Sequence, residues 1–167
     1  MQIRDATESD LPQVVAIYNE ELFTTTSIWS DTAQTLEERR DWFEARCRRG
    51  FPTLVAEHGG RLVGVAAFGD FRDSIRWPGY RFTVEHSVHV FRESWGQGVG
   101  RALMQALFER ARKRRVHAMI GGVDSANARS LLFHENLGFR EVARMPETGW
   151  KHGHWCDLVF VQRFVDE

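Results

Sequence analysis

Three glycines fall within five residues, at Gly96, Gly98 and Gly100, and an amphipathic helical pattern begins directly after them. Glycine reaches backbone dihedrals and close approaches that a Cβ forbids. The first turn of a helix carries unpaired N–H groups and the positive end of the helix dipole. A glycine-rich turn that opens a helix therefore predicts a cradle for an anion, most often a phosphate.

The residues around this turn match neither of two well-known phosphate-binding motifs. The P-loop needs Gly-x4-Gly-Lys-Ser/Thr, and no such string occurs in the chain. The dinucleotide fingerprint needs a third glycine three residues after the second, where this chain has Arg101. The turn also comes late in the chain instead of after a first strand. A nucleotide kinase and a dehydrogenase are therefore disfavoured.

The strand pattern that leads into the turn contains a carboxylate, Glu85. Residues 81–91 alternate with a period of two, which puts Val84 and His86 on one face and Glu85 and His89 on the other. A carboxylate inside a β-rich strand is poorly placed without a purpose. Burial would raise its pKa toward the range that suits a general base. His86, on the apolar face, is expected to be a core residue.

Hydrophobic periodicity and capping signals predict the elements that position these residues. Helices are expected over residues 7–22, 35–49, 98–115 and 127–139, and strands over 2–6, within the hairpin 53–71, and over 81–91, 117–124 and one or two stretches of 140–165. This order, β-α-α-β-β-β-α-β-α-β-β, predicts a mixed α/β fold with one antiparallel half and crossover helices in the other. Ligand sites in such sheets lie where strands part.

The composition is that of one globular domain, which we expect to span residues 1–167. The net charge of −1 predicts no general attraction to nucleic acid or membrane, and the basic run 109–115 is interpreted as a helix end. Cys47 and Cys156 are far apart, which predicts neither a disulfide framework nor a zinc site. No signal-peptide pattern is visible, and no apolar run approaches the ~18 residues of a membrane span. We expect a cytoplasmic protein.

Several motifs, in order along nearly the whole chain, resemble the GNAT family of acyl-CoA N-acyltransferases. That family carries Gln/Arg-x-x-Gly-x-Gly/Ala at the strand–helix junction, where this chain reads Trp95-Gly96-Gln97-Gly98-Val99-Gly100, with Trp95 at the family's first position. "IRDATESDL" resembles the family's first strand and helix start, and "NARSLLFHENLGF" resembles its last helix. "SIW", "GYRFTVEHSV", "FHENLGF" and "GWKHGHWCDL" are similar to the phosphinothricin and methionine sulfoximine N-acetyltransferase branch.

The resemblance implies the GNAT fold, a central, mixed, mostly antiparallel and twisted sheet flanked by helices, with acetyl-CoA as cosubstrate and no metal. It implies that the glycine turn holds the coenzyme pyrophosphate and that the preceding strand pairs with the pantetheine arm through main-chain groups. His89 is given no side-chain role. The residues that the resemblance assigns to the coenzyme are Val88, His89, Val90, Gly96, Gln97, Gly98, Val99, Gly100, Arg101, Asn127 and Asn136.

The resemblance also implies two catalytic residues and direct transfer in a ternary complex. Glu85 matches the branch's general base, and His134 lies where many family members have a Tyr that protonates the leaving thiolate. For the acceptor, an amino-acid carboxylate favours an arginine. The residues expected at the acceptor are Trp29, Arg72, Pro78, Gly79, Tyr80 and Arg81.

The branch acetylates the amino group of small amino acids and analogues such as methionine sulfoximine, methionine sulfone and phosphinothricin, which implies detoxification. It also implies a homodimer, with the segment 149–158 near the interface or the acceptor pocket. Two alternatives stay open. One is the same fold acting on a polyamine, an aminoglycoside or a protein N-terminus, although Arg72 and Arg81 disfavour a polycation. The other is a non-catalytic acyl-CoA-binding sensor, which would not need Glu85.

Overall fold

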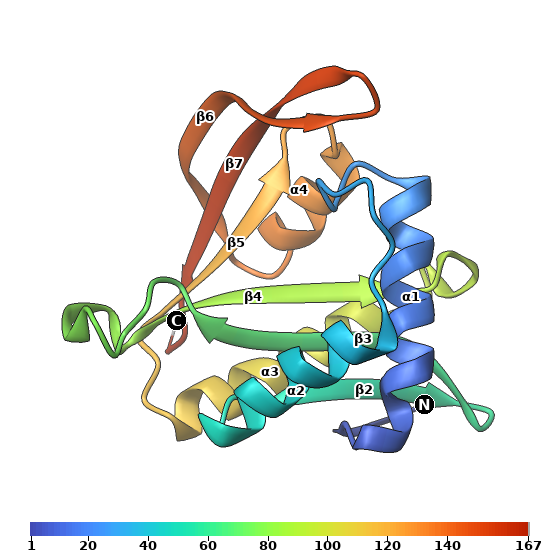
Figure 1. Cartoon of the computed structure of the whole chain (residues 1–167). Coiled ribbons are helices and arrows are strands. Elements are labelled where there is room, and N and C mark those ends of the chain that lie inside the picture. Colours follow the sequence, from blue (N-terminus) through green and yellow to red (C-terminus); the bar gives the residue numbers. More distant parts are fainter. Residues whose placement is uncertain (167) are drawn as a thin grey trace.

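The computed structural model describes residues 1–166 and shows a seven-stranded sheet with helices packed against it (Figure 1). The strand order is β1-β2-β3-β4-β5-β7-β6, and every neighbouring pair is antiparallel except β4 and β5. The strands are β1 (Gln2–Asp5), β2 (Thr53–His58), β3 (Arg61–Asp70), β4 (Thr83–Val90), β5 (Ala118–Asp124), β6 (Arg140–Lys151) and β7 (His154–Phe164). The helices are α1 (Leu11–Thr24), α2 (Leu36–Arg48), α3 (Val99–Lys113) and α4 (Ala128–Glu135). The predicted order of elements and the mixed, mostly antiparallel sheet are confirmed.

Local capping signals explain where the first two helices begin. At α2, the Thr35 side chain accepts from the Glu38 N–H and the Glu38 carboxylate accepts from the Thr35 N–H, which is a complete capping box. At α1, Asp10 accepts from the Thr7 N–H at 2.8 Å. The predicted start at residue 7 is nevertheless wrong, because a short 3-10 turn precedes the α-helix, which begins at Leu11.

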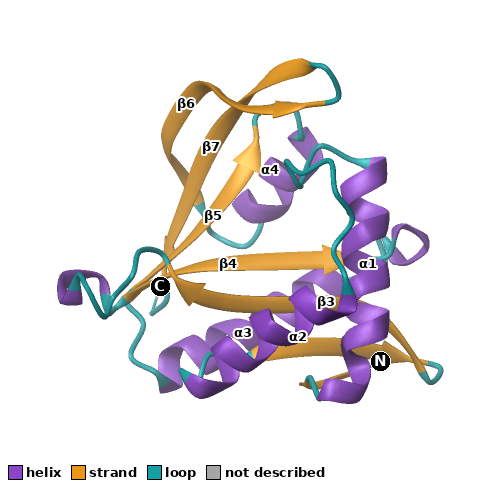
Figure 2. Ribbon diagram, viewed as in Figure 1, coloured by secondary structure: helices purple, strands orange, loops and turns teal. Residues whose placement is uncertain are grey.

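The core lies on both faces of the sheet, between the strands and the helices that cover them (Figure 2). On one face α3 buries Leu103 and Leu107 against Phe68 of β3. On the other face α1 buries Val14 against Val55 of β2. Helices on both faces leave the sheet no free apolar side in its first half, so a ligand must enter where the sheet itself opens.

The sheet opens between β4 and β5. The two strands pair in parallel only at Thr83–Glu85 with Ala118–Ile120. Beyond that point β5 continues along β7, while β4 runs away from it, and Figure 1 shows the two strands diverging from their shared end. The edge of β4 that faces β5 is therefore without a strand partner over Ser87–Val90, as expected for a site at parting strands.

Leu103 offers a direct test of this core. Its side chain is fully buried on α3, so Leu103→Ala removes apolar contacts and leaves a cavity. We expect the free energy of unfolding to fall by about 2–5 kcal/mol, measured by chemical denaturation. Leu132→Ala, at a position that is 56% exposed on α4, is the matched control and should change it little. An equal loss in both variants would contradict this packing.

Candidate active site

The space between the diverging strands is a cavity of about 580 Å³, bordered by β4, the start of α3, α4 and the segment after α1. Eight of the residues expected at the coenzyme line it, namely Val88, Val90, Gly96, Gly98, Val99, Gly100, Arg101 and Asn127. The fold thus brings together a strand, a glycine turn and a later helix start that are separated in the sequence.

The turn before α3 has the backbone geometry that an anion cradle needs. Gly96 and Gly98 adopt φ values of 75° and 81°, which L side chains rarely tolerate. Gly98 is the N-cap of α3 and offers no side chain to the first-turn N–H groups. The N–H groups of Val99, Gly100 and Arg101 therefore have no partner within the helix. A diphosphate fits these donors and the positive end of the helix dipole, so the residues present suit the pyrophosphate of coenzyme A.

Asn127 joins two walls of the cavity. Its Oδ1 accepts from the Ser130 N–H at 3.0 Å, which makes Asn127 the N-cap of α4. Its Nδ2 donates to the Ser27 Oγ at 3.1 Å, from the segment after α1. One amide side chain therefore starts α4 and also holds the opposite wall in place.

Three residues expected at the coenzyme do not line this cavity. His89 directs its Nδ1 to the Glu21 Oε2 at 2.6 Å, and it is Glu21 that borders the cavity. Gln97 donates to the Glu93 carbonyl at 2.9 Å, which keeps its side chain within the turn. Asn136 lies in a second groove on the other side of Arg101. Coenzyme contacts of these three residues stay predictions.

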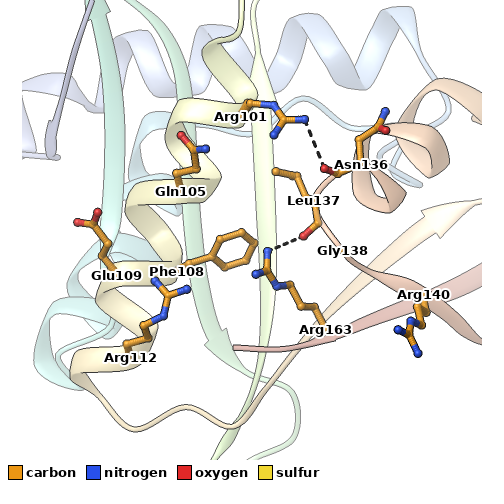
Figure 3. Close-up of a pocket in the computed structure, with 10 residues that line it drawn as sticks. All are labelled: Arg101, Gln105, Phe108, Glu109, Arg112, Asn136, Leu137, Gly138, Arg140 and Arg163. Atoms are coloured by element: carbon orange, nitrogen blue, oxygen red, sulfur yellow. Dashed lines mark hydrogen bonds between the residues drawn. The ribbon is translucent and has the colours of Figure 1, made fainter. Parts of the chain in front are cut away.

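Figure 3 shows that second groove, about 660 Å³ between the outer face of α3 and the turn after α4. Arg101 borders both spaces and donates to the Asn136 carbonyl at 3.3 Å. Arg163 donates to the Leu137 carbonyl in the same way. Both guanidinium groups thus donate hydrogen bonds to backbone carbonyls at the C-terminal end of α4, where the helix dipole favours cations.

Sequence reasoning missed much of the cavity wall. The segment after α1 reads as a polar connection without periodicity, although three of its residues face the cavity. Trp95 donates its indole N–H to the Val90 carbonyl at 2.8 Å, and the Arg129 guanidinium stacks 3.6 Å from the indole centre. Trp95 stands where the family's motif has Gln or Arg, and this difference was the one signal in the sequence that pointed to an altered wall. The residues missed are Glu21, Thr25, Thr26, Ser27, Ser94, Trp95, Ala126, Arg129, Ser130 and Phe133.

Glu85 lies at the last position where β4 still pairs with β5, and it is opposite Gly69 on β3. Its side chain is half-buried, with Oε1 3.7 Å from where a Cβ at Gly122 would lie. Burial raises the pKa of this carboxyl, and the nearby Arg46 guanidinium partly opposes the rise. A carboxylate with a raised pKa at the point where the strands part is suited to general base chemistry.

His134 is buried, not on the surface of α4, and is 4% exposed. Its Nδ1 lies 2.7 Å from the Ser130 carbonyl, so in the neutral ring Nδ1 carries the proton and Nε2 carries the lone pair. Burial lowers its pKa. His134 is not among the residues that line the cavity, so its acid role stays a prediction. The centre of the His134 ring lies 5.1 Å from the centre of the His86 ring. His86 is 7% exposed, as the sequence predicted for a core residue.

Trp29 packs directly onto the backbone of β6. A Cβ at Gly149 would overlap its ring, so glycine is required there. The Trp29 indole N–H is buried and has no hydrogen-bond partner within residues 1–166. Two residues further along β6, Lys151 is 1% exposed and donates to the Ser30 carbonyl. The contacts of Gly149 and Lys151 thus hold the loop that carries Trp29 against β6.

The other residues expected at the acceptor lie on the exposed loop between β3 and β4. A short 3-10 turn covers Pro78–Tyr80 and includes Gly79. The Arg72 guanidinium lies 5.5 Å from the Tyr80 ring centre, so the structure brings these two together. Arg81 instead donates to the Pro78 carbonyl at 2.9 Å and stacks on the Phe82 ring.

Residues 1–166 contain neither a cluster of metal-ligating side chains nor a helix suited to spanning a membrane. No group of three or more His, Cys, Asp or Glu residues there is arranged to hold a metal ion. No helix in that range combines the length and the apolar character needed to cross a membrane.

The sheet opens beside a glycine turn and a helix N-terminus, an arrangement that suits a ligand that carries a diphosphate. In agreement, residues 14–139 match the acetyltransferase (GNAT) family, and the chain belongs to that family.

Particular relatives resemble the whole chain. It is 46% identical to an L-methionine sulfoximine/L-methionine sulfone acetyltransferase of Pseudomonas paraeruginosa, over 98% of this chain and 94% of the relative. It is 36% identical to a phosphinothricin N-acetyltransferase of Alcaligenes faecalis, over 96% of this chain and 81% of the relative. The Salmonella typhimurium protein yncA, solved with its cofactor acetyl-CoA, superposes with a TM-score of 0.94 at 42% identity, covering 100% of this chain and 95% of yncA.

Proposed function

We propose that this protein transfers an acetyl group from acetyl-CoA to the amino group of a small amino acid or analogue, of the methionine sulfoximine, methionine sulfone or phosphinothricin type. The observation that carries the proposal is the cavity where the N–H groups at the start of α3 meet the unpaired edge of β4. Family membership and full-length similarity to enzymes named for these acceptors support the substrate class. Residues 1–167 act as one GNAT domain in this proposal.

The coenzyme supplies the acetyl group as a thioester, and the chain positions it. The N–H groups of Val99, Gly100 and Arg101 bind the pyrophosphate. The main chain at Val88 and Val90 pairs with the pantetheine arm as an added strand would. Asn127, already ordered by two hydrogen bonds, keeps the cavity wall in place. His89, Gln97 and Asn136 contribute through the backbone or at the rim.

Glu85 accepts the proton that the acceptor amine must lose, directly or through one water, because an ammonium group has no lone pair for attack. A C–N bond forms as the C–S bond breaks, and the departing sulfur needs a proton. The proposed source of that proton is the charged form of His134, which burial makes the minor form at neutral pH. A His134→Phe variant that keeps the wild-type kcat would remove His134 from the mechanism.

The acceptor lies on the α2 side of Glu85. Trp29 forms one wall, and the exposed loop with Arg72, Pro78–Tyr80 and Arg81 forms the rim. The arginines favour an anionic acceptor over a polyamine. Acetylation removes the charge of the amino group, and we assign the protein a detoxifying role in the cytoplasm.

The proposal includes a homodimer. Residues 140–148 of β6 are exposed along their whole length at the edge of the sheet. A long edge strand with unpaired N–H and C=O groups favours pairing with another chain. Nearby, Trp150 and Trp155 are half-exposed and pack against each other with ring centres 5.0 Å apart. Light scattering should give the mass of a dimer, and a monomer at every concentration would contradict this assignment.

Thiol release from acetyl-CoA tests the proposed function. The acceptor panel contains methionine sulfoximine, methionine sulfone, phosphinothricin, common L-amino acids, spermidine and kanamycin. We expect turnover with the first three and with few other members of the panel. Turnover only with spermidine or kanamycin would contradict the acceptor class. Coenzyme binding without turnover on any acceptor would favour a sensor or a protein substrate.

A further inference from the structure

Helix α2 turns a cationic face toward the rest of the protein. Arg39, Trp42 and Arg46 recur at intervals of three and four residues, which places them on one side of the helix. The guanidinium groups of Arg39 and Arg46 lie 4.6 Å and 3.9 Å from the Trp42 ring centre. Arg39 is 5% exposed and Arg46 is half-buried. Two arginines therefore stand where an amphipathic helix usually places apolar side chains.

The Arg46 guanidinium lies near two carboxylates, Asp70 and Glu85, which stabilise its charge without forming an ion pair with it. Its Nε is buried without a hydrogen-bond partner, and among residues 1–166 no carboxylate forms an ion pair with it. The neighbouring cations on the same helix end are paired, Arg48 with Glu44 at 3.5 Å and Arg49 with Asp70. Burial lowers the pKa of Arg46 to about 10, so it remains charged at neutral pH. A half-buried, unpaired cation is costly unless an anion joins it.

The position of Arg46 relates it to the proposed base. A Cβ at Gly69 would lie 3.1 Å from an Arg46 Nη, so the guanidinium lies directly over that glycine. Gly69 is paired opposite Glu85 in the β3–β4 ladder. Directly opposed residues of an antiparallel pair project to the same face of the sheet. The Glu85 carboxylate and the Arg46 guanidinium therefore lie on the same face of the sheet, the face that α2 covers, and each acts on the charge of the other.

A base and a nearby cation on one face of the sheet match the two ends of an α-amino acid, whose amine and carboxylate are on the same carbon. We propose that Arg46 binds the α-carboxylate of the acceptor through charge-assisted hydrogen bonds and thereby places the α-amino group at Glu85. This assignment rests on the proposed function. It makes Arg46 the residue that selects α-amino acids over simple amines, with Trp42 stacked beneath the guanidinium to fix its orientation.

Other charged groups around this position are already engaged. The Asp70 carboxylate is paired with Arg49 and accepts from the Ser74 N–H at 3.5 Å. Arg72 and Arg81 lie on the exposed loop, where they contact Tyr80 and the Pro78 carbonyl. Arg46 is thus a less exposed cation than Arg72 and Arg81 and lies closer to the proposed base.

The test compares an acid with its neutral amide in wild type and variants. Initial rates of thiol release are measured with L-methionine sulfone and with L-methionine sulfone carboxamide, which keeps the amine and loses the carboxylate charge. Arg46→Gln is expected to lower kcat/KM for the acid by about 100-fold, mostly through KM, and for the carboxamide by less than about 3-fold. Arg46→Lys should recover part of the loss. Arg48→Gln, on the exposed face of α2, is the matched control and should keep the wild-type values for both acceptors.

The possible failures are distinguishable. Wild-type protein that is inactive on methionine sulfone would overturn the proposed function itself. Active wild type together with equal losses for acid and carboxamide in Arg46→Gln would overturn the carboxylate contact and indicate that Arg46 acts only through the ionisation of Glu85. Thermal stabilisation of each variant by coenzyme A verifies folding. If coenzyme A does not stabilise Arg46→Gln, the Arg46→Lys variant decides alone. An Arg46→Lys variant that discriminates between acid and carboxamide as wild type does supports the contact. An Arg46→Lys variant that loses this discrimination without any rise in KM for the acid overturns the contact.

Discussion

Replacing Glu85 with Gln is expected to lower kcat about 10²- to 10⁴-fold while leaving the KM for acetyl-CoA nearly unchanged. The amide keeps the shape and polarity of the side chain at the point where β4 and β5 part, but it cannot take a proton from the acceptor amine. Steady-state rates of thiol release with methionine sulfone as acceptor give both constants.

The pH dependence of kcat/KM gives a second test of Glu85 as the general base. Burial raises the pKa of the Glu85 carboxyl, so kcat/KM should increase with pH through a value above the ordinary pKa of glutamate. That acidic limb should disappear in Glu85→Gln, because the group that titrates is gone. Glu44→Gln changes an exposed carboxylate that pairs with Arg48 and is the control for charge removal. A variant at Glu85 that keeps both the wild-type rate and the limb would show that another group is the base.

Gly149→Ala should destabilise the protein and weaken coenzyme binding together. The added methyl group would overlap the Trp29 ring, which packs on the Gly149 backbone, so the ring must move. Trp29 belongs to the same loop as Ser27, which borders the cavity and is held by Asn127. We expect the free energy of unfolding to fall by about 1–3 kcal/mol, and the KM for acetyl-CoA to rise several-fold.

A double variant separates this overlap from other effects of Gly149→Ala. In Trp29→Ala/Gly149→Ala the ring is absent, so the added methyl group should cost much less than it does alone. Gly79→Ala is the stability control, since a Cβ there meets no atom within 4 Å. Strictly additive losses in the double variant would contradict direct packing of Trp29 on Gly149.

Local signals predicted most of the fold because they act within a few residues. The capping box at Thr35 and Glu38 and the N-cap Asn127 fixed helix starts without reference to the rest of the chain. The glycine turn was predictable for the same reason, since positive φ values at Gly96 and Gly98 need glycine whatever surrounds them. The start of α1 was misplaced because a 3-10 turn and the first turn of an α-helix share the same capping signals.

The remaining parts of the site depend on tertiary packing that no local pattern encodes. Charged residues dominate 36–48, yet the fold buries Arg39 and places Arg46 near Glu85. His134 gave no sign of burial, because a single histidine on a short helix fits either environment. The segment around Ser27, which forms one wall of the cavity, shows no hydrophobic periodicity in the sequence. Each of these positions depends on packing between elements that are far apart in the sequence.

The central claim is direct transfer between a coenzyme and an amino-acid acceptor bound together at one site. Initial rates measured over a matrix of acetyl-CoA and methionine sulfone concentrations test it most directly. The arrangement of β4, the glycine turn and Glu85 predicts intersecting double-reciprocal lines, because both substrates must be present before the acetyl group moves. Parallel lines would indicate an acetylated enzyme intermediate and would contradict this account.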